Sequence, residues 1–312
     1  NPAKSVETVV QPQKVTIALV TYIPFLGGYY AESLDVLKAS LESLGANTRT
    51  PYDLMVFDNA SCPEVRAYLQ AERDAGRIQY LVLSSQNVGK GGAWNFLFSA
   101  APGDYIAYAD SDIYFFPGWL EAQIDVLERC EQIGMVTGMP LWSPEEFSTA
   151  TLRWAETHPE AGLERGRFLA WEDYWRHSRS LGHAEGKARE HYDSVQDLRV
   201  QLGGESFFVG AGHFQFVARR EVLRQVLPIP SNRPMGEVRS LDVAINAAGY
   251  LRLSTTRWWV QHMGNTRAGI PAGTGAASTR PSSEPRPRQV WKPLRRLALW
   301  LHHKTFEILY KG

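Results

Sequence analysis

The stretch Asp110-Ser111-Asp112 places two carboxylates, with one small residue between them, at the end of an apolar run that begins at Tyr105. Burying an unpaired carboxylate costs several kcal/mol, so the interior of a strand normally excludes it. We therefore expect the strand to end here, either in a plain turn, which Asp and Ser favour, or at a cation site. Carboxylates on a rigid strand end suit Mg²⁺ or Mn²⁺, which keep open positions for phosphate oxygens. The sequence thus predicts a metal site at Asp110 and Asp112.

Polar side chains also follow the other apolar runs in the first half of the chain. Ligands of an open parallel sheet bind at the carboxyl ends of the strands, so these side chains should surround one cleft. The residues predicted to contact a nucleotide there are Thr21 and Tyr22 after the first run, Asp58 after the second, Asn87 after the third, and Asp110 with Ser111 after the fourth. Such a concentration of polar groups is difficult to explain by solubility alone.

The turn NVGKGGAWN at 87–95 carries three glycines, Gly89, Gly91 and Gly92. Glycine lets a backbone approach a ligand closely, and the N-terminus of a following helix favours a diphosphate. The alternative is a tight turn that needs positive φ, and the sequence does not decide between the two. Lys90 adds a cation at the same turn, although a solvated lysine is equally ordinary. Gly89 and Lys90 join the residues predicted to line that cleft.

The elements that must position these residues alternate between strand and helix. β-Branched and apolar runs predict the strands, and leucines spaced by three and four predict the helices. Strands are expected at 15–22, 53–59, 78–84 and 104–110, and helices at 31–45, ended by a stop glycine at Gly45, at 63–76 and from about 91. This alternation implies βαβ units and a parallel sheet with right-handed crossovers. The predicted fold class is α/β.

The regular alternation of predicted strands and helices ends after Trp142. Segment 142–204 is polar, rich in Trp, His, Glu and Arg, and is predicted to be mostly helical. Its aromatic side chains either stack on sugar rings or pack helices onto the sheet. Further along we expect a strand feeding a helix over 213–227, a helix over 240–250 and a strand over 251–262. Residues 231–237 could form a mobile flap over a bound ligand.

Composition excludes some classes of partner. The 312 residues hold 33 Lys plus Arg against 33 Asp plus Glu, so overall charge indicates no nucleic-acid partner. Cys62 and Cys130 form neither metal-ligand spacing nor a disulfide framework, as expected in a reducing, cytoplasmic compartment. No run approaches about 18 apolar residues, so we expect no membrane span.

Several segments together resemble glycosyltransferase family 2, whose inverting enzymes have the GT-A type nucleotide-diphospho-sugar transferase fold. The segments are, in order, VTIALVTY, VFDNAS, QNVGKGGAWN, YADSD and LDVAINAAGYLRLSTTRWWVQHMGN. The resemblance covers about residues 15–265. It implies a mostly parallel, Rossmann-like sheet flanked by helices, with a helical insertion. Within a catalytic domain over 15–264, it implies a nucleotide-sugar-binding half at 15–141 and an acceptor-binding half at 142–264.

The resemblance also implies roles on the donor side. Asp58 would face the nucleotide base, Asn87 and Gly89 would line the donor pocket, and Asp110 would lie near the ribose. Asp112 would bind the Mn²⁺ or Mg²⁺ on the diphosphate. His262 matches a position that in some relatives reaches the metal, and its alternative is a structural role beside Trp258 and Trp259.

Asp242 falls where the family places its catalytic base, often within a Glu-Asp pair, but here Leu241 replaces the glutamate. A competing interpretation is structural, because Ser240 could cap the helix and an aspartate in the first turn is stabilised by the helix dipole. Glu237 is an alternative base. As base, Asp242 would take a proton from an acceptor hydroxyl as that oxygen attacks the anomeric carbon.

The predicted activity is therefore an inverting, metal-assisted transfer from a nucleotide-diphosphate sugar, by preference a UDP-sugar, in glycan, polysaccharide or glycolipid synthesis. The expected partners are that donor and a saccharide or lipid-linked saccharide acceptor, and a homo-oligomer is also compatible with the sequence. Two other classes stay open. One is a non-catalytic nucleotide-sugar-binding scaffold. The other is a sugar nucleotidyltransferase, although TYIPFLGGYY lacks the Gly-rich, Arg-bearing loop which that class needs.

The ends of the chain differ from the rest. Residues 1–14 lack an apolar signal core and are predicted to be a disordered lead-in. Residues 265–290 are rich in Gly, Ala, Ser and Pro and predict a flexible linker. Residues 291–312 predict a basic amphipathic helix, which would lie on the inner face of the plasma membrane, on its own domain or on a second subunit.

Overall fold

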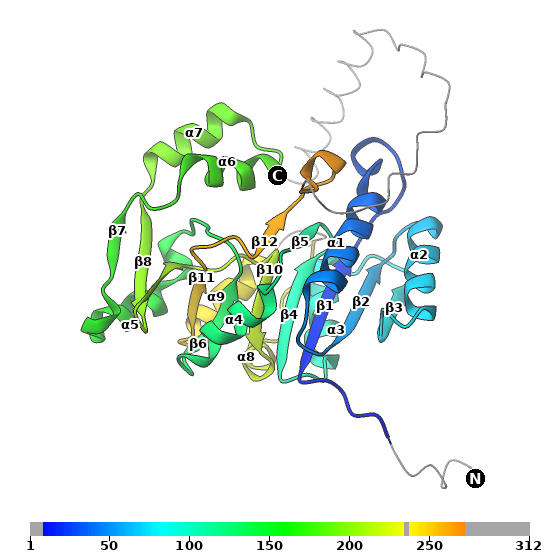
Figure 1. The fold of residues 1–312 in the computed structure, drawn as a ribbon, viewed down its shortest axis with the longest axis horizontal. Helices are drawn as coiled ribbons and strands as arrows, with labels where there is room; N and C mark the ends of the chain where they lie inside the picture. The colour runs from blue at the N-terminus through cyan, green and yellow to red at the C-terminus, as the bar shows by residue number, and fades with distance from the viewer. Residues whose placement is uncertain (1–8, 234–236, 272–312) are drawn as a thin grey trace. The chain divides into compact units, whose positions relative to one another are not determined.

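The computed structural model describes residues 9–233 and 237–271 (Figure 1). The strands are β1 Val15–Thr21, β2 Tyr52–Asn59, β3 Tyr80–Ser84, β4 Tyr105–Asp110, β5 Ile113–Phe115, β6 Ile133–Thr137, β7 Glu164–Gly166, β8 Asp197–Leu202, β9 Glu205–Val209, β10 Gln215–Arg219, β11 Leu251–Ser254 and β12 Val260–His262. The helices are α1 Ser33–Asn47, α2 Pro63–Asp74, α3 Gly89–Ala100, α4 Trp119–Glu128, α5 Thr149–Thr157, α6 Trp171–Ser180, α7 Glu185–Ser194, α8 Arg220–Gln225 and α9 Arg239–Ala247.

One large sheet runs in the order β3-β2-β1-β4-β10-β6-β11-β9-β8-β7. The strands β1 to β4 are parallel to one another, as are β6 and β11. Between these groups, β10 is antiparallel to both β4 and β6, so β4 and β6 point the same way. The carboxyl ends of β1 to β4, β6 and β11 therefore lie along one edge. The predicted α/β fold class, with a Rossmann-like sheet flanked by helices, is confirmed.

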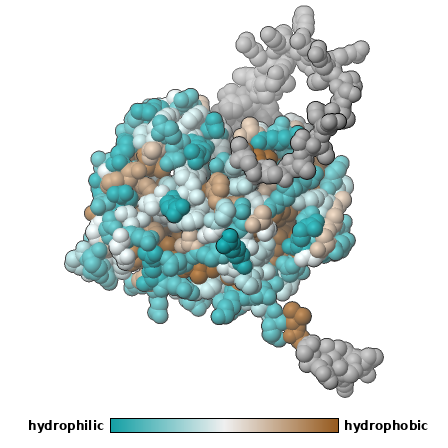
Figure 2. Space-filling model, viewed as in Figure 1, coloured by the Kyte–Doolittle hydropathy of each residue, from teal (hydrophilic) through white to brown (hydrophobic). Residues whose placement is uncertain are grey.

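Alternating residues of each central strand pack into two separate cores. On β1, Ile17 and Leu19 face the core that α1, α2 and α4 cover, whereas Ala18 and Val20 face the core under α3, α8 and α9. Burial on both faces explains why these strands are continuous apolar runs. On the face shown in Figure 2, apolar residues form separated patches among hydrophilic ones. Many of the chain's apolar side chains are instead buried in the two cores.

The helix expected to stop at Gly45 continues for two more residues, because α1 ends at Asn47. Gly45 lies inside the helix, and a Cβ placed on it would meet no other atom within 4 Å. The stop-glycine interpretation is therefore wrong. Gly45 takes no part in ending the helix, and a small residue is not required there by packing.

The segment 142–204 is less helical than predicted. Besides α5, α6 and α7 it contains β7 and β8, which extend the large sheet through β9. Strands β8 and β9 form a hairpin in which Leu202 pairs with Glu205 across Gly203 and Gly204, whose φ values are +60° and +83°. A Gly-Gly pair between two strand-like runs is a hairpin signal, and it was available in the sequence.

The strand predicted over 251–262 is in fact two strands in two different sheets. β11 lies in the large sheet beside β6, whereas β12 pairs antiparallel with β5 in a small separate sheet. In that small sheet His262 is opposite Ile113. The break between β11 and β12 thus brings His262 next to the turn that carries Asp112.

The predicted lead-in, residues 1–14, ends within the described part of the chain, and the predicted linker, residues 265–290, begins within it. Lys14, assigned to the lead-in, already accepts backbone hydrogen bonds from Asp104 and Tyr105. Arg267–Gly269, assigned to the linker, form a 3-10 helix, and Arg267 pairs with Asp35 of α1. The rest of the linker and the amphipathic helix at 291–312 lie outside the described residues. Within the described ranges, no helix is long and apolar enough to cross a membrane.

Candidate active site

The pair Asp112 and His262 lies at the carboxyl edge of the sheet, where the turn after β4 meets β12. His262 Nε2 is 3.2 Å from Asp112 Oδ2. On its other side, His262 Nδ1 is 2.9 Å from the Ser180 hydroxyl at the end of α6, which fixes the orientation of the ring. The backbone N–H of Met263 donates to the Asp112 carbonyl at 2.8 Å, so strand pairing locks the two residues together.

The Asp112 carboxylate is poorly compensated where it stands. Its side chain is only 21% exposed, and Oδ1 is buried without a hydrogen-bond partner among the described residues. Burial raises the pKa of Asp112, the neighbouring His262 lowers it, and the charge of Asp110 raises it again. A buried carboxylate oxygen without a partner is a position that a cation would satisfy.

The residues at this edge fit a divalent cation that is coordinated partly by the protein and partly by a bound substrate. One carboxylate and one imidazole suit Mn²⁺, and carboxylates also suit Mg²⁺. Among the described residues, no group of three or more His, Cys, Asp or Glu is close enough to hold a metal ion on its own. A cation bound at Asp112 and His262 would therefore need water or phosphate oxygens to complete its coordination.

The other carboxylate of the motif, Asp110, is already paired. Lys90 Nζ lies 2.6 Å from Asp110 Oδ2, and the Tyr108 hydroxyl donates to Oδ1. Lys90 is itself buried, with its ammonium 5.2 Å from the Trp94 ring centroid and 5.7 Å from that of Tyr108. Because Lys90 neutralises Asp110, the structure separates the two predicted metal ligands, and within the described ranges Asp112 has no ion pair with a lysine or arginine.

The turn before α3 is organised by two asparagines. Asn59 at the end of β2 accepts from the Val88 N–H at 2.8 Å and donates to Asn87 Oδ1 at 3.0 Å. Asn87 Oδ1 also accepts the Gly89 N–H at 2.8 Å, and Gly89 has a φ of +73°. Asn87 and Gly89 thus lie at the predicted edge, and Gly89 is required there by its backbone conformation.

The two following glycines are approached by the chain itself. A Cβ on Gly91 would lie 2.5 Å from the Pro230 carbonyl oxygen, and the Gly92 N–H donates to the Ser231 hydroxyl at 2.9 Å. Asn95, one turn further along α3, exchanges two hydrogen bonds with the backbone of Ile229. Gly91 and Gly92 are therefore needed for the packing of 229–231 against α3.

We expect Gly91→Ala to destabilise the protein by about 1–3 kcal/mol, because the new methyl group must displace the backbone at Pro230. Gly45→Ala is the matched control, since it also lies in a helix but has free space around its Cα. It should be neutral or stabilising by about 0.5–1 kcal/mol. Urea unfolding of both variants measures the difference, and equal stability would contradict the close packing of 229–231 on α3.

The remaining predicted nucleotide contacts differ in how accessible they are. Asp58 is fully buried, and its carboxylate accepts from the Ser61 N–H at 3.1 Å and from Arg66 Nε at 2.9 Å. Its oxygens hold the loop after β2, and no part of Asp58 is exposed to meet a base. Thr21 is buried too, with a hydroxyl that lacks a partner among the described residues, whereas Tyr22 is 39% exposed.

Ser111 lies between the two carboxylates, partly exposed, in the turn that joins β4 to β5. Glu237, the alternative base, is exposed, and its carboxylate accepts the Asn232 N–H at 3.0 Å. This hydrogen bond lowers the pKa of Glu237. The structure thus gives the Glu237 carboxylate a role in holding its own loop.

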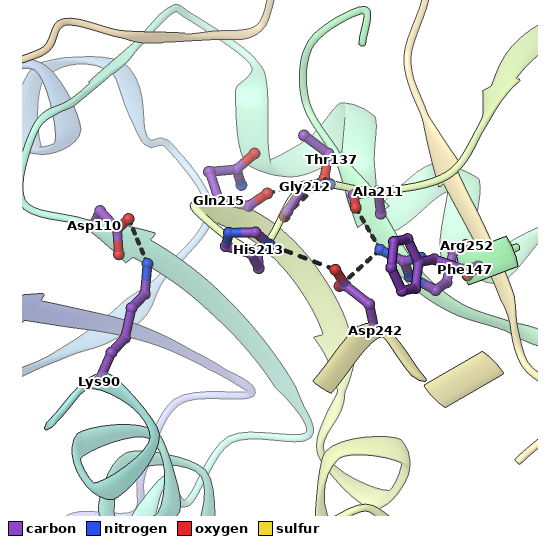
Figure 3. A network of polar contacts seen from close by, with 10 residues as sticks. All are labelled: Lys90, Asp110, Thr137, Phe147, Ala211, Gly212, His213, Gln215, Asp242 and Arg252. Atoms are coloured by element: carbon purple, nitrogen blue, oxygen red, sulfur yellow. Dashed lines mark hydrogen bonds and ion pairs between the residues drawn. The ribbon is translucent and has the colours of Figure 1, made fainter. Parts of the chain in front are cut away.

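Asp242 lies in the first turn of α9 and is enclosed by two basic side chains (Figure 3). Arg252 Nη2 on β11 is 2.7 Å from Asp242 Oδ1, and His213 Nδ1 is 3.4 Å from Oδ2. Sequence reasoning missed both basic residues. An arginine inside the apolar strand LRLS was a usable signal for Arg252, whereas nothing in the sequence around His213 marks it.

The Arg252 guanidinium is almost fully buried and serves several groups at once. Besides its ion pair with Asp242, it donates hydrogen bonds to the carbonyl oxygens of Phe147 at 2.6 Å and Ala211 at 2.5 Å. Burial lowers the pKa of Arg252, and the charge of Asp242 opposes that effect. The ion pair ties α9, β11 and the loop before β10 together beneath the edge of the sheet.

The sequence of this chain matches a known family over a stretch that includes Lys90 and Asp112. Residues 29–181 match the family model described as Glycosyl transferase family 2. The chain carries a glycosyltransferase family 2 domain. An uncharacterized glycosyltransferase of Nostoc sp. is 24% identical over 100 residues, which are 32% of this chain and 31% of that protein. A Bacillus subtilis protein named as a glycosyltransferase, EpsE, is 32% identical over 130 residues, which are 41% of this chain and 46% of EpsE.

The chain spans between about a third and a half of the length of these curated relatives. Among solved structures, residues 1–349 of Staphylococcus aureus TarS superpose with a TM-score of 0.47 and 11% identity, covering 79% of this chain and 59% of that one. A mannosyltransferase of Pyrobaculum calidifontis in complex with GDP-Man and Mn²⁺ gives a TM-score of 0.45 and 16% identity, covering 80% and 56%.

The aromatic residues of α6 and α7 pack largely against one another. Trp171 stacks on Trp175 with 5.9 Å between ring centroids, and Tyr174 stacks on His191 of α7 at 6.1 Å. These contacts join α6 to α7 and support the packing interpretation of the aromatics. His177 on α6 packs on Phe214, and burial with neighbouring histidines lowers its pKa to about 3, so this ring is neutral.

Proposed function

We propose that this family 2 domain transfers a sugar from a nucleotide-diphosphate sugar to an acceptor hydroxyl, with inversion at the anomeric carbon. The observation that carries the proposal is the uncompensated Asp112 carboxylate beside His262, at the edge where the parallel strands end. Lys90, at the start of α3, pairs with Asp110, two residues before Asp112. An edge that combines a cation site with a helix N-terminus suits a diphosphate.

Three residues would bind the diphosphate of the donor. Asp112 and His262 would hold a divalent cation, which when bound supplies positive charge beside the departing diphosphate. Lys90, buried and held by Asp110, would offer the diphosphate a fixed N–H donor that needs no reorganisation during the reaction. The nucleotide would extend from there towards the ends of β1 and β2, where Tyr22 is exposed.

The acceptor side would be supplied by the second half of the domain. Asp242 provides a negative charge beside His213 at the edge beyond β10, where the proton of an attacking hydroxyl would be taken up. A hollow of about 510 Å³ lies in the same half and is lined by Trp142, Arg165, Arg167 and Asp193, among others. Such a mixture of an indole ring with charged groups suits a saccharide, which presents both hydroxyls and C–H faces.

Donor hydrolysis without an acceptor tests the proposed function directly. The purified chain is incubated with UDP-glucose, UDP-N-acetylglucosamine or GDP-mannose, each with Mn²⁺, Mg²⁺ or EDTA, and release of the nucleoside diphosphate is measured. We expect slow, metal-dependent hydrolysis of one donor, with NMR showing that the released sugar has the inverted anomeric configuration. A thermal shift with UDP or GDP but no hydrolysis of any donor would indicate a binding scaffold instead.

A further inference from the structure

Asp242 is enclosed too tightly to reach an acceptor by itself. Its side chain is 6% exposed, with Oδ1 against Arg252 and Oδ2 against His213. A general base must come within hydrogen-bond reach of the proton that it removes. The His213 side chain, which contacts Asp242 Oδ2 at 3.4 Å, is 32% exposed.

The loop that carries His213 is held rigidly between the two halves of the site. The Gly212 N–H donates to the Thr137 hydroxyl at 2.7 Å, and the Ala211 carbonyl accepts from Arg252. On the other side of His213, the Phe214 carbonyl accepts the Asp110 N–H at 2.8 Å. The imidazole therefore lies between Asp110 and Asp242 in the view of Figure 3. Fixed neighbours on both sides favour a group that must be positioned accurately.

We infer that His213, oriented by Asp242, is the general base that takes the proton from the acceptor hydroxyl; this inference rests on the proposed function and identifies a residue of that same site. Asp242 accepts the Nδ1–H of the imidazole, which leaves the Nε2 lone pair free to accept a proton. Asp242, His213 and the acceptor hydroxyl would then play the parts of the carboxylate, imidazole and nucleophile of a hydrolase triad. In this scheme Asp242 is a positioning residue, and His213 is the catalytic one.

The reaction balances without a further reactant. The acceptor O–H bond breaks and its proton goes to His213 Nε2, while the oxygen forms a bond to the anomeric carbon from the face opposite the diphosphate. The bond from that carbon to the diphosphate oxygen breaks, and its electron pair leaves with the diphosphate. The Asp242 carboxylate stabilises the imidazolium that forms, and the imidazolium then returns its proton to water.

The charges around His213 are compatible with this role. Arg252, the cation nearest to Asp242, is shared among Asp242 and two carbonyl oxygens and does not contact the His213 ring in any described contact. Lys90 and Asp110 neutralise each other on the donor side. His177, which also lies near His213, is neutral. Asp242 is thus the charged group that directly contacts the imidazole.

The decisive experiment compares His213→Gln, Asp242→Asn and His158→Gln in the donor-hydrolysis assay, where water is the acceptor. We expect His213→Gln to lower kcat at least about 100-fold with little change in the KM of the donor, because glutamine fills the space but cannot take a proton. His158→Gln changes a histidine at the end of α5 and should turn over like the wild type. The thermal shift produced by UDP or GDP with Mn²⁺ should be the same in all three variants and the wild type.

Chemical rescue separates the base from a structural residue. Added imidazole should restore turnover of His213→Ala by about tenfold or more, and should not restore that of Asp242→Asn. Turnover of His213→Gln within about threefold of the wild type would overturn the inference. So would a larger loss in Asp242→Asn together with no rescue of His213→Ala, since Asp242 would then be the base. If the wild type itself hydrolyses no donor, the proposed function fails, and with it the inference.

Discussion

Replacing Asp112 by asparagine should lower donor turnover by about 10²- to 10³-fold, the loss seen when one group that stabilises developing charge is removed. Asparagine keeps the shape of the side chain but removes the charge that would hold a cation beside His262. Hydrolysis of the active donor, measured against increasing Mn²⁺, gives both the rate and the metal dependence. Near-full turnover of Asp112→Asn at saturating Mn²⁺ would show that the metal is held elsewhere or is not required.

The same variant should not lose stability. Burial raises the pKa of Asp112, which means that the folded protein disfavours the charged carboxylate, so a neutral amide removes a strain that the site carries for its function. The thermal midpoint of Asp112→Asn without metal should equal or exceed that of the wild type. Asp104→Asn is the control, since Asp104 is exposed just before β4, at the opposite end of the strand, where it pairs with Arg220. It should affect neither turnover nor metal dependence.

The first half of the fold could be predicted from the sequence because its strands are buried on both faces. Continuous apolar runs at β1, β2 and β4 and leucine-spaced helices leave few alternatives to a parallel sheet. The antiparallel β10 and the small sheet of β5 and β12 could not be predicted in this way, because strand order depends on contacts between distant segments. The hairpin of β8 and β9 could have been predicted from its Gly203-Gly204 turn signal, but the polar composition of segment 142–204 indicated helices instead.

The candidate site, too, could be predicted from the sequence only in part. The carboxylates at the end of β4 mark the edge of the sheet, and the structure places His262 beside Asp112 as the resemblance implied. The sequence could not show that Lys90 neutralises Asp110 and leaves Asp112 uncompensated, because both pairs form between separate elements. For the same reason His213 gives no signal in the sequence. The role of His213 can be recognised only from its contact with Asp242, which is 29 residues away in the sequence.

The buried pair of Arg252 and Asp242 should dominate the stability of the second half. We expect Arg252→Met to lower the free energy of unfolding by about 3–5 kcal/mol, since it leaves the Asp242 charge buried without a cation. The carbonyl oxygens of Phe147 and Ala211 also lose their donor, which adds to the cost. Urea unfolding at neutral pH measures the effect.

Two further variants identify the source of that loss. Arg199 on β8 pairs with Glu164 in a partly exposed ion pair, so Arg199→Met should cost no more than about 1 kcal/mol. Adding Asp242→Asn to Arg252→Met should recover part of the lost stability, because the unpaired charge disappears, but not all of it, because the two carbonyl oxygens remain without Arg252. If the double variant is less stable than Arg252→Met alone, the buried charge of Asp242 is not what Arg252 compensates. In that case the arginine serves mainly to bind the two carbonyl oxygens, and the loop that positions His213 depends on Arg252 more than on Asp242.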